Sequence, residues 1–180
     1  ISPEEIWKII SVFSLMYCMQ TNIPNPLQRY NEGEPLESFF EDVKRVLMLD
    51  KLNYEEFVHI WCSSISIPSS RMHRLIHKMR VPIAAVVNIN HAHWERVCGY
   101  FTRNIRCCVL SFETGMTMPS TAMLMKTHKE LEENLNRKIL NPIYLGRRKT
   151  HLAVAAELDI PTYDASSSNL PQQLESLGII

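Results

Sequence analysis

The stretch Val81–Gly115, VPIAAVVNINHAHWERVCGYFTRNIRCCVLSFETG, decides how this chain is expected to fold. Pro82–Ile89 is almost continuously apolar and rich in β-branched residues, which is typical of a strand buried on both faces. Glu95–Phe101 and Ile105–Phe112 flank a polar triplet, TRN, that predicts a hairpin turn between two further strands. The stretch therefore predicts three strands in a row.

Helical patterns precede these strands. A capping box with proline at the first helical position, at Ser2–Glu5, begins a predicted helix that ends at about Met19. Residues 22–35 hold prolines and a glycine and predict a loop. Apolar residues at helical spacing then predict helices over 36–47, 53–61 and 68–79.

After the strands the pattern is mixed. Residues 119–139 predict a helix, 146–150 a loop, and 170–177 a short helix that ends at Gly178. Residues 152–160 suit a helix as well as a strand, and the context favours a strand; residues 161–169 form a polar, serine-rich loop. We expect one α+β domain over 1–180, with a helical part (1–80) packed on a strand-rich part (81–180) whose small sheet is mainly antiparallel, in a papain-like or Ulp-like arrangement.

Charge and hydropathy narrow the classes of partner. The chain has 180 residues, and 19 basic residues balance 19 acidic ones. A neutral chain has no long-range attraction for nucleic acid or an anionic membrane, and no apolar run approaches the length of a membrane span, so we expect neither partner. The basic run Arg147-Arg148-Lys149 predicts a solvated loop, and it lacks the glycine and lysine spacing of a phosphate-binding loop.

The cysteines bear on the compartment and on metal binding. Five cysteines without framework spacing indicate reduced thiols in the cytosol or nucleus. No signal peptide is visible, and the chain opens on Ile1, so we expect a piece excised from something longer. His91 and His93 would share a strand face, but Cys98 and the CC pair at 107–108 lack the spacing of zinc ligands. We therefore expect buried, unpaired cysteines in strands, and neither a metal nor a cofactor.

His93, Trp94 and Glu113 form the candidate site. His93 would open the middle strand and Glu113 would close the last, so the two side chains can meet at one edge of the sheet. A carboxylate beside an imidazole is the arrangement of an acid-oriented general base. A structural histidine and a core tryptophan account for the same residues, and no obvious nucleophile completes the set.

The order strand, His93-Trp94, strand, hairpin, acid, helix, strand, polar loop, helix resembles the Ulp/SENP proteases of ubiquitin-like proteins and their adenovirus-protease and YopJ-type relatives. The resemblance covers roughly residues 81–180. It implies that His93 is the base, that Glu113 orients it and that Trp94 walls the substrate tail. Asp164 would occupy the acidic position of the nucleophile loop, and Ser168 would stand where the family has cysteine.

The chain departs from that family in the loop. No cysteine follows Cys108, Thr162 or Tyr163 stands where an oxyanion-hole glutamine belongs, and Asn169 replaces a glycine. The resemblance implies either a cysteine-type isopeptidase or acyltransferase acting on a protein partner, such as a ubiquitin-like protein, or a pseudoenzyme that keeps the cleft for protein interaction or assembly. Whether any catalysis occurs stays open, and so does a purely structural role.

Overall fold

The described residues of the computed structural model form two compact units. The structure describes residues 25–65, 69–101 and 104–180, so the helix expected over 2–19 and most of the expected hairpin turn lie outside them. Unit 1 contains the described residues of Ile1–Ile67, with Asn88–Gly99 and Ser111–Gly115; unit 2 contains those of Pro68–Val87, Tyr100–Leu110 and Met116–Ile180. The expectation of a single domain stays a prediction.

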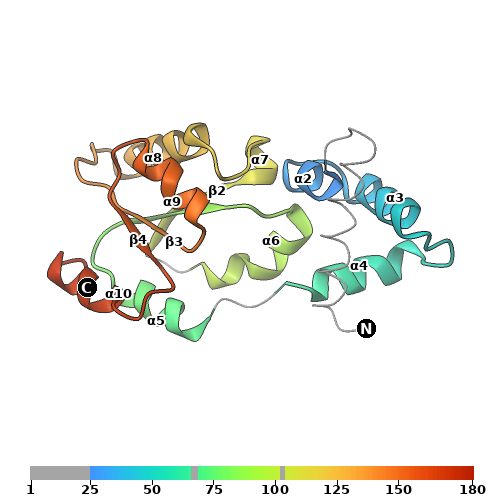
Figure 1. Ribbon diagram of the computed structural model, residues 1–180, viewed down its shortest axis with the longest axis horizontal. Helices are drawn as coiled ribbons and strands as arrows, with labels where there is room; N and C mark the ends of the chain where they lie inside the picture. Colours follow the sequence, from blue (N-terminus) through green and yellow to red (C-terminus); the bar gives the residue numbers. More distant parts are fainter. Residues whose placement is uncertain (1–24, 66–68, 102–103) are drawn as a thin grey trace. The chain divides into compact units, whose positions relative to one another are not determined.

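Unit 1 is helical where the structure describes it (Figure 1). Its helices are α2 (Pro26–Asn31), α3 (Leu36–Leu47), α4 (Tyr54–Ser63), α6 (His91–Val97) and α7 (Ser111–Thr114). The predictions of α3 and α4 are confirmed, and α4 begins with the predicted capping box between Asn53 and Glu56. The loop predicted over 22–35 was wrong in part, because the Asn25 side chain caps α2 and Pro26 begins it.

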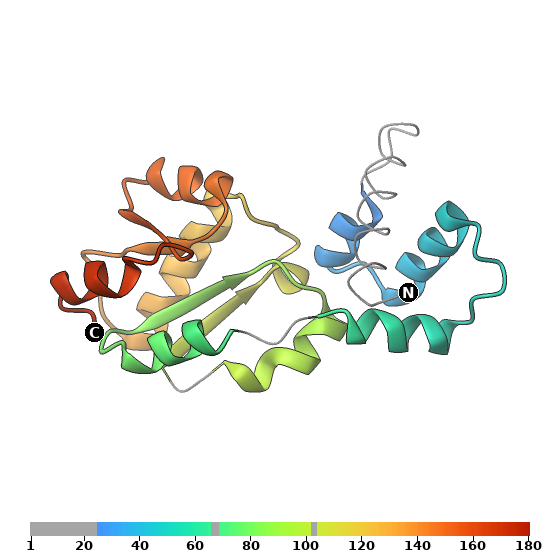
Figure 2. The same cartoon turned by 60° about the horizontal axis from the view of Figure 1, so that its bottom comes forward.

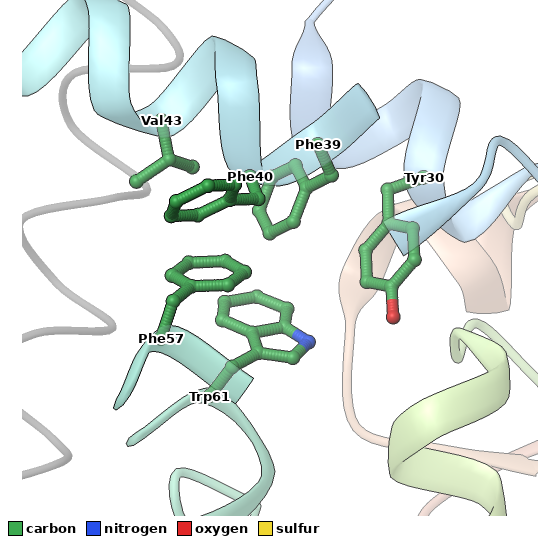
Figure 3. Close-up of a cluster of buried hydrophobic side chains, with 6 residues drawn as sticks. All are labelled: Tyr30, Phe39, Phe40, Val43, Phe57 and Trp61. Atoms are coloured by element: carbon green, nitrogen blue, oxygen red, sulfur yellow. The ribbon is translucent and has the colours of Figure 1, made fainter. Parts of the chain in front are cut away.

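Aromatic rings fill the core of unit 1 (Figure 3). Trp61 and Phe39 are fully buried, with their ring centroids 4.8 Å apart. Tyr30 stacks on Phe39 at 4.7 Å, and Phe57 stacks on Trp61 at 6.2 Å. Burying rings of this size supplies most of the hydrophobic stabilisation that a small helical unit has available.

Unit 2 alternates strands and helices (Figure 1). Its elements are α5 (Ser70–Lys78), β1 (Ile83–Val87), β2 (Ile105–Leu110), α8 (Thr121–Leu135), β3 (Tyr144–Gly146), α9 (Lys149–Ala156), β4 (Thr162–Asp164) and α10 (Leu170–Ser176). A short 3₁₀ turn, η1 (Cys98–Tyr100), follows α6 in the chain. The strands at 82–89 and 105–112 and the helices at 68–79, 119–139 and 170–177 are confirmed within a few residues.

The strand pairs are parallel, so the prediction of a mainly antiparallel sheet was wrong. β1 pairs with β2 and β3 pairs with β4, each in a parallel two-stranded sheet, and Figure 2 shows β1 and β2 side by side as green and yellow-green arrows. Parallel strands need a long crossover, and the chain between β1 and β2 supplies one that contains α6. The α+β class is consistent with the elements, whereas the papain-like arrangement is not.

Two segments predicted as strands are helical. Residues 95–100 belong to α6 and η1. Asn90 caps the helix that begins there, and its Oδ1 accepts a hydrogen bond from the His93 amide at 3.0 Å. His93 and Val97, one helical turn apart, are the buried residues of α6. Most of 152–160 is the second half of α9, so the helical alternative for that segment was the right one. β4 lies within the segment predicted as a polar loop.

Two apolar clusters form the core of unit 2. The first gathers Leu75 of α5 with Leu170 and Leu174 of α10. The second gathers Val109 of β2 with Met123 of α8, together with Ala155 of α9. In the part of the chain that the structure describes, no helix is long and apolar enough to cross a membrane.

Candidate functional site

His93 is a buried residue of unit 1. Its Nε2 lies 2.9 Å from the Trp61 carbonyl oxygen, and its Nδ1 lies 3.1 Å from the Asn90 side-chain amide, which is a donor. Nε2–H therefore donates to the carbonyl and Nδ1 accepts, which describes a neutral imidazole. Burial lowers the pKa of His93, the nearby Arg96 charge lowers it further, and the bond to the Trp61 carbonyl opposes the shift.

The ring of His93 also packs. It stacks on the Trp61 indole with centroids 4.7 Å apart and planes 17° from parallel, and Ser64 Oγ lies 3.4 Å from Nε2. Trp94, expected to wall a substrate tail, is half-buried on α6. Through these contacts, His93 of α6 is packed against and hydrogen-bonded to α4.

Glu113 lies in α7 and not at the end of a strand. Its side chain is exposed, whereas His93 is 7% exposed. The expected contact between the two stays a prediction, but the strand positions on which it was based were wrong.

Asp164 and Ser168 belong to unit 2. Asp164 ends β4, and its Oδ1 accepts hydrogen bonds from the Ser166 amide at 2.7 Å and the Ser166 hydroxyl at 2.6 Å. These bonds lower the pKa of Asp164, and the Arg147 charge adds to the effect. Ser168 is exposed, and its hydroxyl lies 3.5 Å from Asn169 Oδ1. The arrangement is a hydrogen-bonded turn after a strand.

The turn between β3 and α9 was predicted from the sequence only as a solvated loop, and the structure places it between a strand and a helix. Gly146 ends β3 directly beside Asp164 of β4, and Arg147, Arg148 and Lys149 follow it, all exposed. Arg148 is the N-cap residue of α9 and makes no side-chain cap, so the first amides of α9 have no such partner. Three cations thus stand at a strand end and a helix start.

His151 lies in the first turn of α9. Its Nε2 is buried and has no hydrogen-bond partner among the described residues. Burial lowers the pKa of His151, and the Arg148 charge lowers it further. A neutral imidazole therefore stands next to the three cations in the sequence.

Ser111 was also missed. It is fully buried directly after β2, and its hydroxyl accepts a hydrogen bond from the Ile89 amide at 2.9 Å and donates to the Ile89 carbonyl at 2.8 Å. The bonds tie the segment after β1 to the segment after β2. A serine that directly follows an apolar strand was the signal available in the sequence.

The described residues include no group of three or more His, Cys, Asp or Glu side chains that could hold a metal ion. The predicted burial is confirmed for Cys107 in β2, whereas Cys108 of β2 is only half-buried and Cys98 is exposed in η1. Cys98 is exposed because the segment that holds it is helical and not a buried strand.

Solved structures share this fold. The chain resembles a predicted HAD-like family hydrolase from Porphyromonas gingivalis, with a TM-score of 0.69, 16% identity, and coverage of 97% of this chain and 89% of that one. It also resembles a HAD-family enzyme from Bacteroides thetaiotaomicron, with a TM-score of 0.67, 20% identity, and coverage of 92% and 84%. The complex of that wild-type enzyme with magnesium and inorganic phosphate gives a TM-score of 0.62 at 19% identity, covering 88% of this chain and 85% of that one. No protein-family model matches the chain, and no curated protein matches it.

The fold is therefore HAD-like, and the resemblance to Ulp/SENP proteases was wrong. Parallel strand pairs with an intervening helix are present in place of the expected antiparallel meander. The strand-end positions from which a site at His93 and Glu113 was predicted are therefore absent from the described residues. A cysteine-protease fold, an isopeptidase or acyltransferase function, and a pseudoenzyme of that family are all overturned by the HAD-family neighbours.

Proposed function

We propose that this chain recognises phosphorylated small molecules, the substrate class of a phosphatase-type hydrolase, at the turn between β3 and α9. The carrying observation is the cluster of Arg147, Arg148 and Lys149 at the carboxyl end of a parallel strand and the start of a helix. The complex of a HAD-family neighbour with inorganic phosphate supports the same class of ligand.

The position of the turn favours ligand binding. In α/β folds, ligands bind at the carboxyl ends of parallel strands. Gly146 and Asp164 mark the carboxyl ends of β3 and β4, and they are paired in register. The turn that begins at Arg147 therefore projects from a strand end, where ligands bind in folds of this class.

The charges select an anion. The start of a helix carries a partial positive charge and unsatisfied amides, which together bind phosphate. Two guanidinium groups and an ammonium group add donors that match phosphate oxygens. The neighbouring Asp164 carries one negative charge against the three positive charges of Arg147, Arg148 and Lys149, so the turn keeps a net positive charge.

The magnesium of the neighbours does not fit the same residues. Magnesium takes oxygen ligands, usually with at least one carboxylate. Three exposed cations at the turn repel a divalent cation, and the described residues include no group of three or more His, Cys, Asp or Glu side chains that could hold one. We therefore derive no step through magnesium, and the proposal concerns recognition of the phosphate group by this chain's own donors.

Calorimetric titration of sugar phosphates and nucleoside monophosphates tests the proposal. We expect binding that weakens by about tenfold or more in the double variant Arg147→Ala/Arg148→Ala, because charge-assisted hydrogen bonds are lost. The matched control Lys129→Ala/Arg137→Ala removes the same charge from exposed positions elsewhere in unit 2 and should leave binding unchanged. Equal losses in both variants, or no binding by the parent chain, would contradict the proposal.

Release of inorganic phosphate is a second readout on the same compounds, with and without magnesium. Release that needs Arg147 and Arg148 but not magnesium would extend the proposal from recognition to hydrolysis. Release that strictly requires magnesium and survives the double variant would place the reaction away from the β3–α9 turn and would contradict the proposed location.

A cytosolic or nuclear compartment remains part of the proposal. Cys98 is exposed and Cys62 is half-buried, and burial raises the pKa of the Cys62 thiol. Exposed thiols persist where glutathione and thioredoxin keep them reduced.

A further inference from the structure

The chain turns back directly after β4, beside the site proposed for phosphate. Asp164 of β4 is paired in register with Gly146 of β3, whose carbonyl accepts a hydrogen bond from the Ala165 amide at 2.9 Å. The Ser167 amide donates to the Asp164 carbonyl at 3.0 Å, which closes a β-turn over residues 164–167. This segment, called the β4 turn below, therefore lies next to the start of the β3–α9 turn.

A cation from a distant part of the sequence reaches the β4 turn. The guanidinium group of Arg71, at the start of α5, donates a hydrogen bond to the Ser167 carbonyl at 2.6 Å, although 96 residues separate the two in the chain. The packing of α5 on α10 holds this contact in place, since Leu75 packs against Leu170 and Leu174 (Figure 1). Arg71 remains exposed, and a guanidinium group has several N–H donors, so donors remain for a ligand.

Arg147 approaches the β4 turn from the side of the β3–α9 turn. Hydrogen bonds from Ser166 lower the pKa of Asp164, and the charge of Arg147 lowers it further, so Arg147 is within electrostatic range of the Asp164 carboxylate. Arg147 also directly follows Gly146, the residue paired with Asp164. The β4 turn thus has Arg147 near its first residue and Arg71 bonded to its last.

The cations near the β4 turn differ from those of α8 in their partners. Lys126 and Lys129 of α8 each form an ion pair with a glutamate one helical turn later. Among the described residues, neither Arg71 nor Arg147 has a carboxylate within ion-pair distance, and α5 contains no acidic residue. Two arginines beside one turn repel each other, and a bound anion relieves that repulsion.

We propose that this site binds small molecules with two phosphate groups, one at the β3–α9 turn and the other at Arg71. The inference rests on the proposed function, because the first phosphate binds at the β3–α9 turn. A guanidinium group forms paired hydrogen bonds with phosphate oxygens, so Arg71 supplies donors for the second group. The exposed Asp164 carboxylate, on the turn that separates the two positions, repels an anion placed directly on that turn. The ligand therefore carries its phosphates on a carbon skeleton, as a sugar bisphosphate does, and not joined as a diphosphate.

Calorimetric titration tests the inference with fructose bisphosphate, which has one phosphate at each end of the sugar, and with fructose monophosphate. We expect the bisphosphate to bind the parent chain about tenfold more tightly, because a charge-assisted, bidentate contact is added. Arg71→Ala should abolish this difference and leave the affinity for the monophosphate unchanged. The matched control Arg137→Ala removes the same charge from an exposed position after α8 and should keep the difference.

A measurement on the parent chain covers the case in which Arg71→Ala disturbs the β4 turn. In ¹⁵N-resolved spectra, fructose bisphosphate should shift the Nε–H signal of Arg71 and the amide signal of Arg147 with one midpoint, because one ligand contacts both. Separate midpoints, or a shift at Arg147 alone, would overturn the inference.

The proposed function and the inference fail in different ways. A parent chain that binds neither inorganic phosphate nor the monophosphate contradicts the proposed function, and the inference falls with it. A parent chain that binds the monophosphate at the β3–α9 turn, but binds the bisphosphate no more tightly, contradicts the inference alone. Equal losses in Arg71→Ala and Arg137→Ala would overturn it as well, since the attraction would then be a general effect of charge. Adenosine diphosphate that binds as tightly as fructose bisphosphate would contradict the requirement for separated phosphates.

Discussion

The surroundings of His93 and the turn between β3 and α9 differ in where their polar groups are directed. In unit 1, both ring nitrogens of His93 have partners, and the ring is stacked on Trp61. In unit 2, Arg147, Arg148 and Lys149 are exposed at the end of a strand. Satisfied and buried polar groups hold a fold together, whereas convergent exposed charges are available to a ligand. The difference favours a structural role for the first region and supports the recognition proposed for the second.

Removing the ring on which His93 stacks should have the largest effect. Trp61 is fully buried against Phe39 and Phe57, so Trp61→Ala leaves a cavity and should cost about 3–5 kcal/mol of unfolding free energy. Urea unfolding measures it, with the exposed Leu177→Ala as the control. A loss below about 1 kcal/mol would mean that the aromatic cluster does not stabilise unit 1.

Ser111→Ala should have a smaller effect. The substitution leaves the buried Ile89 amide without its acceptor, which should cost about 1–3 kcal/mol. Ser176→Ala removes a similar hydroxyl from an exposed position, and the unfolding free energy should then change by less than about 0.5 kcal/mol. Equal effects in the two variants would refute a structural role for the Ser111 hydroxyl.

Acidification should have a smaller effect still. The pKa of His93 is lower when folded than when unfolded, so the unfolded chain binds more protons as the pH falls. The stability is therefore complete above the ordinary histidine pKa of about 6.5 and is lost as the pH falls below it. Unfolding at about pH 7.5 and about pH 5.5, on either side of that value, should show this loss in the parent chain and in the exposed-site control His91→Ala. The loss should shrink in His93→Gln, and a His93→Gln chain that keeps the full pH dependence would contradict a buried neutral imidazole.

The helices α3 and α4 and the strands β1 and β2 could be predicted because their signals are local. Apolar residues at helical spacing gave α3, and a capping box gave the start of α4. The apolar runs gave β1 and β2. The segment between them was misread, because the Asn90 cap that starts α6 competes with a β-like composition. Once α6 was taken for a strand, an antiparallel meander followed.

The candidate site could not be predicted to the same extent, because the role of each of its residues depends on contacts with residues that are distant in the sequence. The imidazole of His93 is hydrogen-bonded to the backbone carbonyl of Trp61, 32 residues earlier in the chain. No residue spacing in the sequence predicts a bond over that distance. The basic run at 147–149 was visible in the sequence, but it gains significance only from the strand that ends before it and the helix that starts within it. Pairing of β3 with β4 was equally invisible, since both strands are three residues long.

Chemical-shift mapping with inorganic phosphate tests the contrast between the two regions most directly. In ¹⁵N-resolved spectra of the full chain, the account predicts saturable shifts grouped at the amides of Arg147, Arg148 and Lys149, at the start of α9. The amides of Asn90 and His93 should not move, because their surroundings are closed by internal hydrogen bonds. Shifts confined to Asn90 and His93, or no saturable shift at the β3–α9 turn, would contradict the assignment of recognition to unit 2.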